Sequence, residues 1–334
     1  MAKGIRDTDY LGISARIRAM ENSLLTRDRM EQLLEARTEE DAAKLLTECG
    51  YPPLDPRHPE EMDASLSQVR QETFRDLADS APDPRYIDFF RLKYDYHNVK
   101  ALLKGAALGT DPNHMLTELG RIPSLDLAEA VSREDWDSLP GKLGVAAAEA
   151  KEVLDTTRDP QLADIVLDRW CYADLAETAE ETRSPFLAGY VRVQVDAANL
   201  RALVRTLRMG KNADFLKGVL LDGGEVDPDG ILAVSAAHGG GLAELYAPTA
   251  LARAAESGAE AAKGGAVTEF EKLCDDAVSA YLDQARFVPF GDAPLVGYLA
   301  ARETEYANLR ILLLGRAAGL SADVIRSRLR SGAV

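Results

Sequence analysis

Cysteine is scarce in this sequence of 334 residues, which contains only Cys49, Cys171 and Cys274. These residues lie about a hundred positions apart, so the chain has neither a CxxC metal pair nor an even disulfide framework. The four histidines show neither HxxxH spacing nor neighbouring cysteines. We therefore expect no metal site and a reducing, cytoplasmic environment.

Long apolar runs are also missing. The N-terminal segment MAKGIRDTDYLG lacks the apolar stretch of a signal peptide, and the most apolar stretch near the other end, Leu309 to Leu314, is soon followed by Arg316. We expect no direct membrane span, so that any membrane association passes through another protein.

Basic residues are few relative to acidic ones. The chain has 39 lysines and arginines against 55 aspartates and glutamates, which gives a net charge of −16. A field of that sign repels phosphate backbones and anionic lipid surfaces unless a local basic patch overcomes it. We therefore expect no nucleic acid among the primary partners.

Nucleotide-binding and hydrolase motifs are absent too. The Gly-Lys pairs at Gly141 and Gly210 lack the upstream glycine and the following hydroxyl of a phosphate-binding loop. The segment HGGG from His238 resembles the oxyanion loop of some esterases, but no GxSxG motif accompanies it, so we interpret it as a loop. We predict no cofactor and no catalytic residue.

What the sequence does contain is one segment in three copies. The copies are RLKYDYHNVKALLKG from Arg91, RVQVDAANLRALVRT from Arg192 and ARETEYANLRILLLG from Ala301, and they align without a gap. Each carries an acid and, three positions later, an asparagine. These six structural repeat marks are Asp95, Asn98, Asp196, Asn199, Glu305 and Asn308.

The apolar positions around these marks have the spacing of one helix face, and a proline stands eleven residues before each acid, where a helix begins. No sustained alternation of apolar and polar residues suggests a strand. We predict an all-α protein of three similar helical domains in tandem, spanning residues 1–122, 123–224 and 225–334.

Three further features recur or punctuate the chain. We predict that a second, shorter helix follows each long one, and that Gly120 and Gly224 mark joints between the domains. The alanine- and glycine-rich tract 252–266 and the HGGG loop are expected to be mobile connections. The predicted N-caps of the short helices are Asp111, Asn212 and Ser321.

The acid and asparagine pairs allow two interpretations. An enzyme would use Asp95 or Glu305 as a general acid or base. A catalytic site is needed once, however, whereas this pair stands at three equivalent positions, so we favour an architectural role in tying helix ends together. The base that follows each asparagine is interpreted as part of a solvated face. These bases are Lys100, Arg201 and Arg310.

The last 25 residues contain several arginines within an acidic protein. They are Arg310, Arg316, Arg326, Arg328 and Arg330, accompanied there by a single acid, Asp323. Such a segment suits either a docking edge for an acidic partner or the C-terminal end of a helix.

The order and spacing of these features resemble the family of C subunits of V/A-type ATPases, whose eukaryotic equivalent is called d. The resemblance rests on ARIRAMENSLLT near the N-terminus, the three (D/E)xxN(V/L)(K/R) helices and the final YLAARETEYANLRILLLGRAAGLSADVIRSRL. It covers nearly the whole chain and is weakest between residues 125 and 180.

The resemblance implies a funnel-shaped protein with three similar helical domains around a pseudo-threefold axis. It implies a non-catalytic adaptor, one copy per complex, on the cytoplasmic side of the membrane rotor ring. The central-stalk subunits D and F would bind its open side, and torque would pass through it to a ring that carries protons or sodium ions. The direction of the parent machine, synthase or pump, stays open.

A helical repeat scaffold that binds unrelated proteins is the alternative, because stacked helical units form such surfaces. Units of about 100 residues argue mildly against it, since stacked repeats usually have 20 to 45.

Overall fold

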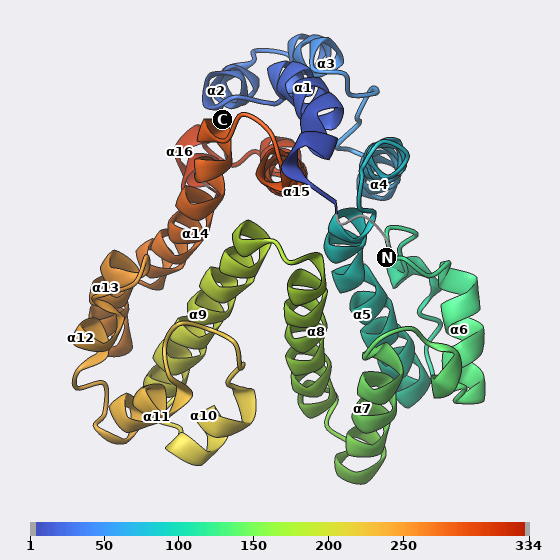
Figure 1. The fold of residues 1–334 in the computed structure, drawn as a ribbon. Coiled ribbons are helices and arrows are strands. Elements are labelled where there is room, and N and C mark those ends of the chain that lie inside the picture. Colours follow the sequence, from blue (N-terminus) through green and yellow to red (C-terminus); the bar gives the residue numbers. More distant parts are fainter. Residues whose placement is uncertain (1–4, 331–334) are drawn as a thin grey trace. The chain divides into compact units, whose positions relative to one another are not determined.

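The computed structural model of the chain describes residues 5–330, and every regular element among them is a helix, which confirms the all-α prediction (Figure 1). The α-helices are α1 (Leu11–Met20), α2 (Arg27–Glu35), α3 (Glu39–Glu48), α4 (Pro59–Ala78), α5 (Arg85–Leu108), α6 (Ser124–Arg133), α7 (Leu143–Thr157), α8 (Pro160–Thr182), α9 (Pro185–Arg208), α10 (Ala213–Val219), α11 (Pro228–Ala236), α12 (Leu242–Tyr246), α13 (Ala252–Ala262), α14 (Val267–Asp283), α15 (Asp292–Ala317) and α16 (Ala322–Arg326). The 3-10 helices are η1 (Asp7–Tyr10), η2 (Glu21–Ser23), η3 (Asn113–Met115), η4 (Trp136–Ser138) and η5 (Gln284–Phe287).

The chain divides into two compact units. Unit 1 combines residues 1–87 with residues 282–334, and unit 2 comprises residues 88–281. This partition is coarser than the division into 1–122, 123–224 and 225–334, which stays a prediction. Within residues 5–330, none of the helices combines the length and the apolar character that a membrane crossing requires.

The three repeated segments form the long helices α5, α9 and α15, as predicted. Helix α9 shows why it begins where it does: the Ser184 hydroxyl accepts a hydrogen bond from the Leu187 amide at 3.0 Å, and Pro185 occupies the first helical position. After the helix, Gly210 adopts a left-handed φ of 62° and turns the chain back.

A short helical turn follows each long helix, with one difference among the three. Asn212 caps α10 and Ser321 caps α16 through their side-chain oxygens, which confirms both predictions. Asp111 instead accepts from the Asn113 amide at 3.0 Å, and the turn that follows is the 3-10 helix η3, whose N-cap is Pro112. Asp111 is therefore not the N-cap, and at this turn the prediction was wrong. An added Cβ at Gly105 would lie 2.9 Å from Pro112, so the chain passes close to α5 here.

Each unit contains a core built on the same plan. In unit 2, α9 packs with α10, α11, α12, α13 and α14, all of which follow it in sequence. In unit 1, α15 packs with α16, which follows it, and with α2, α3 and α4, which lie more than 200 residues earlier. The same arrangement is therefore contiguous in one case and discontinuous in the other.

The alanine- and glycine-rich tract is not a mobile connection: most of it is helix α13. Ala254, Ala255 and Ala261 are buried, and an added Cβ at Gly258 would come within 3.0 Å of Phe270 and 3.1 Å of Val204. The small residues allow α13 to approach α9 and α14 closely. The HGGG segment is a turn that leads into α12, as expected of a loop.

Candidate functional site

The three repeated asparagines make one contact in three places. In each case the side-chain amide donates to a backbone carbonyl and accepts from the amide of the same residue. Asn98 pairs in this way with Thr117 at 2.8 and 2.9 Å, and Asn199 pairs with Leu221 at 2.8 and 2.8 Å. Asn308 pairs with Arg330 at 2.9 and 2.8 Å. Each asparagine thereby takes the place of a backbone partner for the segment that returns to the long helix after the short helical turn, which we call the returning segment.

The repeated acids accept backbone amides from the joint that follows each turn. Asp196 accepts from Glu225 at 3.0 Å and from Val226 at 3.1 Å. Asp95 accepts from Ile122 at 3.2 Å and from the Arg121 side chain at 2.6 Å. In these two copies the acid and asparagine pair therefore holds one returning segment against its long helix, and we call the contacts of each such pair a clamp.

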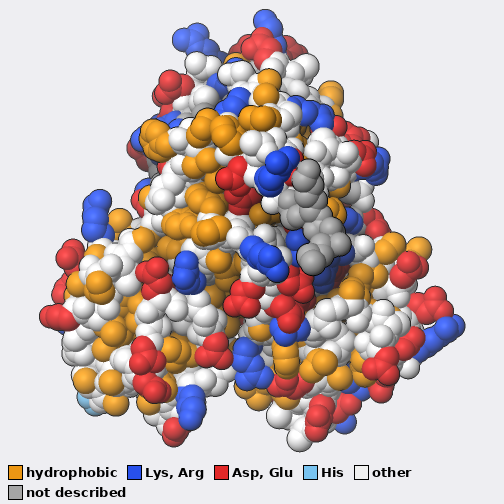
Figure 2. All heavy atoms as spheres, in the orientation of Figure 1, with side chains coloured by type: hydrophobic (Ala, Val, Ile, Leu, Met, Phe, Trp, Pro, Cys, Tyr) orange, Lys and Arg blue, Asp and Glu red, His pale blue; other side chains and the backbone are white. Residues whose placement is uncertain are grey.

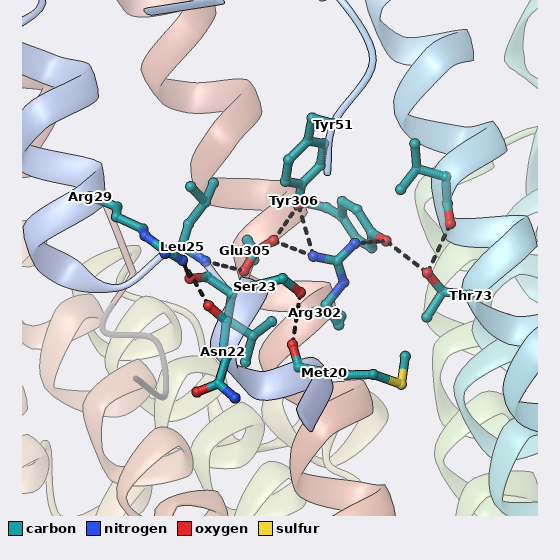
Figure 3. A network of polar contacts seen from close by, with 12 residues as sticks. Met20, Asn22, Ser23, Leu25, Arg29, Tyr51, Thr73, Arg302, Glu305 and Tyr306 are labelled. Carbon is teal, nitrogen blue, oxygen red and sulfur yellow. Dashed lines mark hydrogen bonds and ion pairs between the residues drawn. The ribbon is translucent and has the colours of Figure 1, made fainter. Parts of the chain in front are cut away.

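The third clamp draws its joint from a distant part of the sequence. Glu305 accepts from the Leu25 amide at 2.8 Å, so residues near the N-terminus occupy the place that residues 122 and 226 hold in the other clamps. Its other carboxylate oxygen accepts from Tyr51 and Arg302. Figure 3 shows these side chains converging on Glu305, with the Arg302 guanidinium next to the Tyr306 hydroxyl, 2.9 Å away.

Two of the joints require glycine for a steric reason. An added Cβ at Gly120 would lie 2.3 Å from Asp95 Oδ1, and one at Gly224 would lie 2.1 Å from Asp196 Oδ1. Ser23 stands at the matching place in the third clamp, two residues before the accepted amide, and there the acid is the longer Glu305. The carboxylate thus approaches the chain most closely where no side chain is in the way.

Burial dominates the electrostatics of the acids. It raises the pKa of Asp95, of Asp196 and of Glu305, while the hydrogen bonds they accept act in the opposite direction. Asp95 is 0%, Asp196 2% and Glu305 5% exposed. A general acid must reach a substrate, whereas the hydrogen bonds to these carboxylates come from inside the protein.

The repeated bases are not simply solvated, contrary to the expectation. Lys100 pairs with Asp168 on α8, Arg201 pairs with Glu271 and Asp275 on α14, and Arg310 pairs with Asp63 on α4. Each base therefore joins its long helix to the helix beside it in the same unit. A shared role for these bases could have been inferred from the sequence, because each one stands at the same distance from the acid of its own repeat.

Several C-terminal arginines also have partners within unit 1. Arg326 pairs with Glu31 at 2.8 Å, and Arg316 donates to the carbonyls of Leu33 and Leu34 at the end of α2. These contacts favour the helix-end interpretation over a docking edge for both residues. On the face drawn in Figure 2, acidic and basic side chains are interspersed.

The residues that complete the clamps were missed by the sequence reasoning. Arg121, Tyr51 and Arg302 have no counterpart at equivalent positions in the other copies, so the repeat gave no signal for them. Among residues 5–330, no group of three or more histidine, cysteine or acidic side chains is arranged to hold a metal ion.

Known proteins resemble this chain over nearly its whole length. The model of a family described as ATP synthase (C/AC39) subunit matches residues 13–328. The C subunit of the V-type sodium ATPase of Enterococcus hirae is 24% identical over 323 residues, which cover 96% of this chain and 98% of that protein. The C subunit of the A-type ATP synthase of Methanocaldococcus jannaschii is 25% identical over 351 residues, covering 96% and 86% of the two chains. The protein of the same name from Haloferax volcanii is 28% identical over 289 residues, covering 79% and 80%.

Proposed function

Because the chain belongs to the ATP synthase (C/AC39) subunit family, we propose that it is a non-catalytic central-stalk subunit of a V/A-type rotary ATPase or ATP synthase. In this role it couples the rotating stalk subunits D and F to the membrane rotor ring during proton or sodium transport. It acts at the cytoplasmic side of the membrane, as one copy per complex, and reaches the membrane through the ring.

The observation that carries this proposal is the family match from residue 13 to residue 328. It includes all three long helices and all six repeat marks. The curated relatives are named as the C subunits of a sodium ATPase and of ATP synthases, that is, as components of complexes. A component of such a complex needs no ATP site or membrane span of its own.

The clamps support a mechanical task. A subunit that transmits torque must resist deformation, and the clamp of Asp196 and Asn199 fixes its returning segment to α9 by four hydrogen bonds that are buried or partly buried. We propose that Asp95, Asn98, Asp196, Asn199, Glu305 and Asn308 are structural residues, and that the three clamped modules are arranged around a pseudo-threefold axis.

Reconstitution tests the proposal. The purified chain is mixed with stalk subunits D and F and, separately, with detergent-solubilised rotor ring, and each mixture is analysed by size-exclusion chromatography. We expect a stable complex in both cases. A chain that binds neither partner while remaining folded would contradict the adaptor role.

A coupling assay separates the adaptor from an enzyme. Vesicles that contain the complex without this chain are expected to hydrolyse ATP without moving ions, and addition of the chain restores ion movement. Asp168→Asn, which removes only an exposed partner of Lys100, serves as a control and restores coupling fully. An activity of the isolated chain that one clamp acid alone abolishes, with folding intact, would favour the enzyme interpretation.

A further inference from the structure

The clamp around Asp95 contains two buried acids and one buried base. Asp95 on α5 and Asp174 on α8 are 0% and 3% exposed. Arg121 lies between them, with its Nε 2.6 Å from Asp95 Oδ2 and its Nη2 3.7 Å from Asp174 Oδ2. A single positive charge therefore faces two buried negative charges.

The two carboxylates are unequally stabilised. Asp95 receives a hydrogen bond from the guanidinium and another from the Ile122 amide. Asp174 receives one from the Tyr96 hydroxyl at 3.2 Å, and the Arg121 Nη2 that faces it is too distant to form another. That Nη2 has no hydrogen-bond partner among the described residues. Asp174 is thus the acid that gains more from a proton.

Neighbouring charges do not remove the imbalance. Arg91 lies 3.9 Å from Asp88, and Lys142 lies 3.1 Å from Glu177, so these charges largely offset one another. Glu118 accepts from Ser124. The titratable and charged side chains around the two acids are Asp88, Arg91 and Tyr96 on α5, Glu118 and Arg121 in the segment after η3, Lys142 before α7, and Cys171 and Glu177 on α8.

We propose that Asp174 is a proton switch that controls how Arg121 is shared. When Asp174 is ionised, it attracts the free end of Arg121 and ties the joint at residues 120–122 to α8. When Asp174 is protonated, Arg121 forms an ion pair with Asp95 only, and the electrostatic contact between the joint and α8 is lost. The inference does not depend on the proposed function.

The direction of the pH effect follows from burial, which raises the pKa of Asp174, while the charge of Arg121 opposes the rise. The folded chain then binds this proton more tightly than the unfolded chain, in which the pKa is about 3.9. The contribution to stability is fully present below the unfolded pKa and is lost as the pH rises through the folded pKa.

Urea unfolding of the full chain between pH 4 and pH 8 tests the switch. Asp174→Asn keeps an oxygen for the Tyr96 hydroxyl but cannot ionise. Relative to this variant, the unfolding equilibrium constant of the native protein should increase with pH by up to about tenfold per pH unit between the two pKa values. Asp168→Asn on the same helix should follow the native protein throughout.

A direct titration of the Asp174 carboxyl in the folded chain tests its pKa without an unfolding measurement. In a chain with ¹³C-labelled aspartate carboxyls, the signal that Asp174→Asn removes identifies Asp174. We expect this signal to titrate above the ordinary aspartate range. An ordinary or lowered pKa at this signal would overturn the proposal. So would a pH dependence that Asp174→Asn retains, or one that Asp95→Asn rather than Asp174→Asn abolishes.

Discussion

The clamps around Asp196 in unit 2 and Glu305 in unit 1 do the same work with different chemistry. Asp196 accepts hydrogen bonds from two backbone amides, and its joint contains Gly224. Glu305 accepts one backbone amide and is surrounded by Tyr51 and Arg302. At Asp196, where the joint follows the long helix in sequence, backbone groups are enough. Where it comes from a distant segment, buried side chains complete the contact.

The comparison predicts that replacing the clamp acid lowers the unfolding free energy more in unit 1, at Glu305, than in unit 2, at Asp196. Glu305→Ala leaves Arg302, 8% exposed, without its carboxylate and is expected to cost about 3–5 kcal/mol of unfolding free energy. Asp196→Ala leaves two amides without an acceptor and should cost about 1–3 kcal/mol. Urea denaturation of both variants measures the difference, and equal losses would contradict the account of a side-chain-dependent clamp.

For the asparagines we expect the opposite order, with the larger loss of stability at Asn199 in unit 2 and the smaller one at Asn308 in unit 1. Asn199→Asp places a carboxylate oxygen against the Leu221 carbonyl in a buried site, with an expected loss of about 2–4 kcal/mol. Asn308→Asp faces the carbonyl of Arg330, which is exposed, so solvent should reduce the loss. Thermal unfolding of the two variants side by side tests the order, and a larger effect at Asn308 would reverse the interpretation.

The glycine joint offers a steric test that exists only in unit 2. Gly224→Ala forces a Cβ toward Asp196 Oδ1 and should cost about 1–3 kcal/mol. Gly218→Ala, in α10 with open space around it, is the matched control and should be neutral or stabilising by up to about 1 kcal/mol. If both substitutions behave alike in urea unfolding, the close approach at residue 224 does not limit stability.

The smallest expected effect concerns the repeated bases. The Arg201 side chain is 20% exposed and pairs with two acids, whereas the Arg310 side chain is 53% exposed and pairs with Asp63. Arg201→Ala should cost about 1 kcal/mol and Arg310→Ala less than that, because solvent screens exposed pairs. Added salt should weaken both contributions, which denaturation at low and high ionic strength would detect.

Much of the helical architecture could be predicted from periodicity, because the acids, asparagines and leucines repeat on one helix face. The family resemblance, read from the same segments, is confirmed by a match across residues 13–328. Helix α13 was missed because small residues are typical of both linkers and close helix contacts. The pairing of Leu25 with Glu305 could not be predicted, because spacing along a sequence carries no signal for contacts 280 residues apart.

The discontinuous core of unit 1 has a consequence for synthesis on the ribosome. Residues 88–281 can begin to fold as soon as they emerge, since their core contacts lie within that stretch. Leu33 and Leu46, by contrast, must wait for Leu309 and Leu312 before they are covered. During that interval the early helices expose apolar surface, which makes them the natural place for a chaperone to bind and for aggregation to begin.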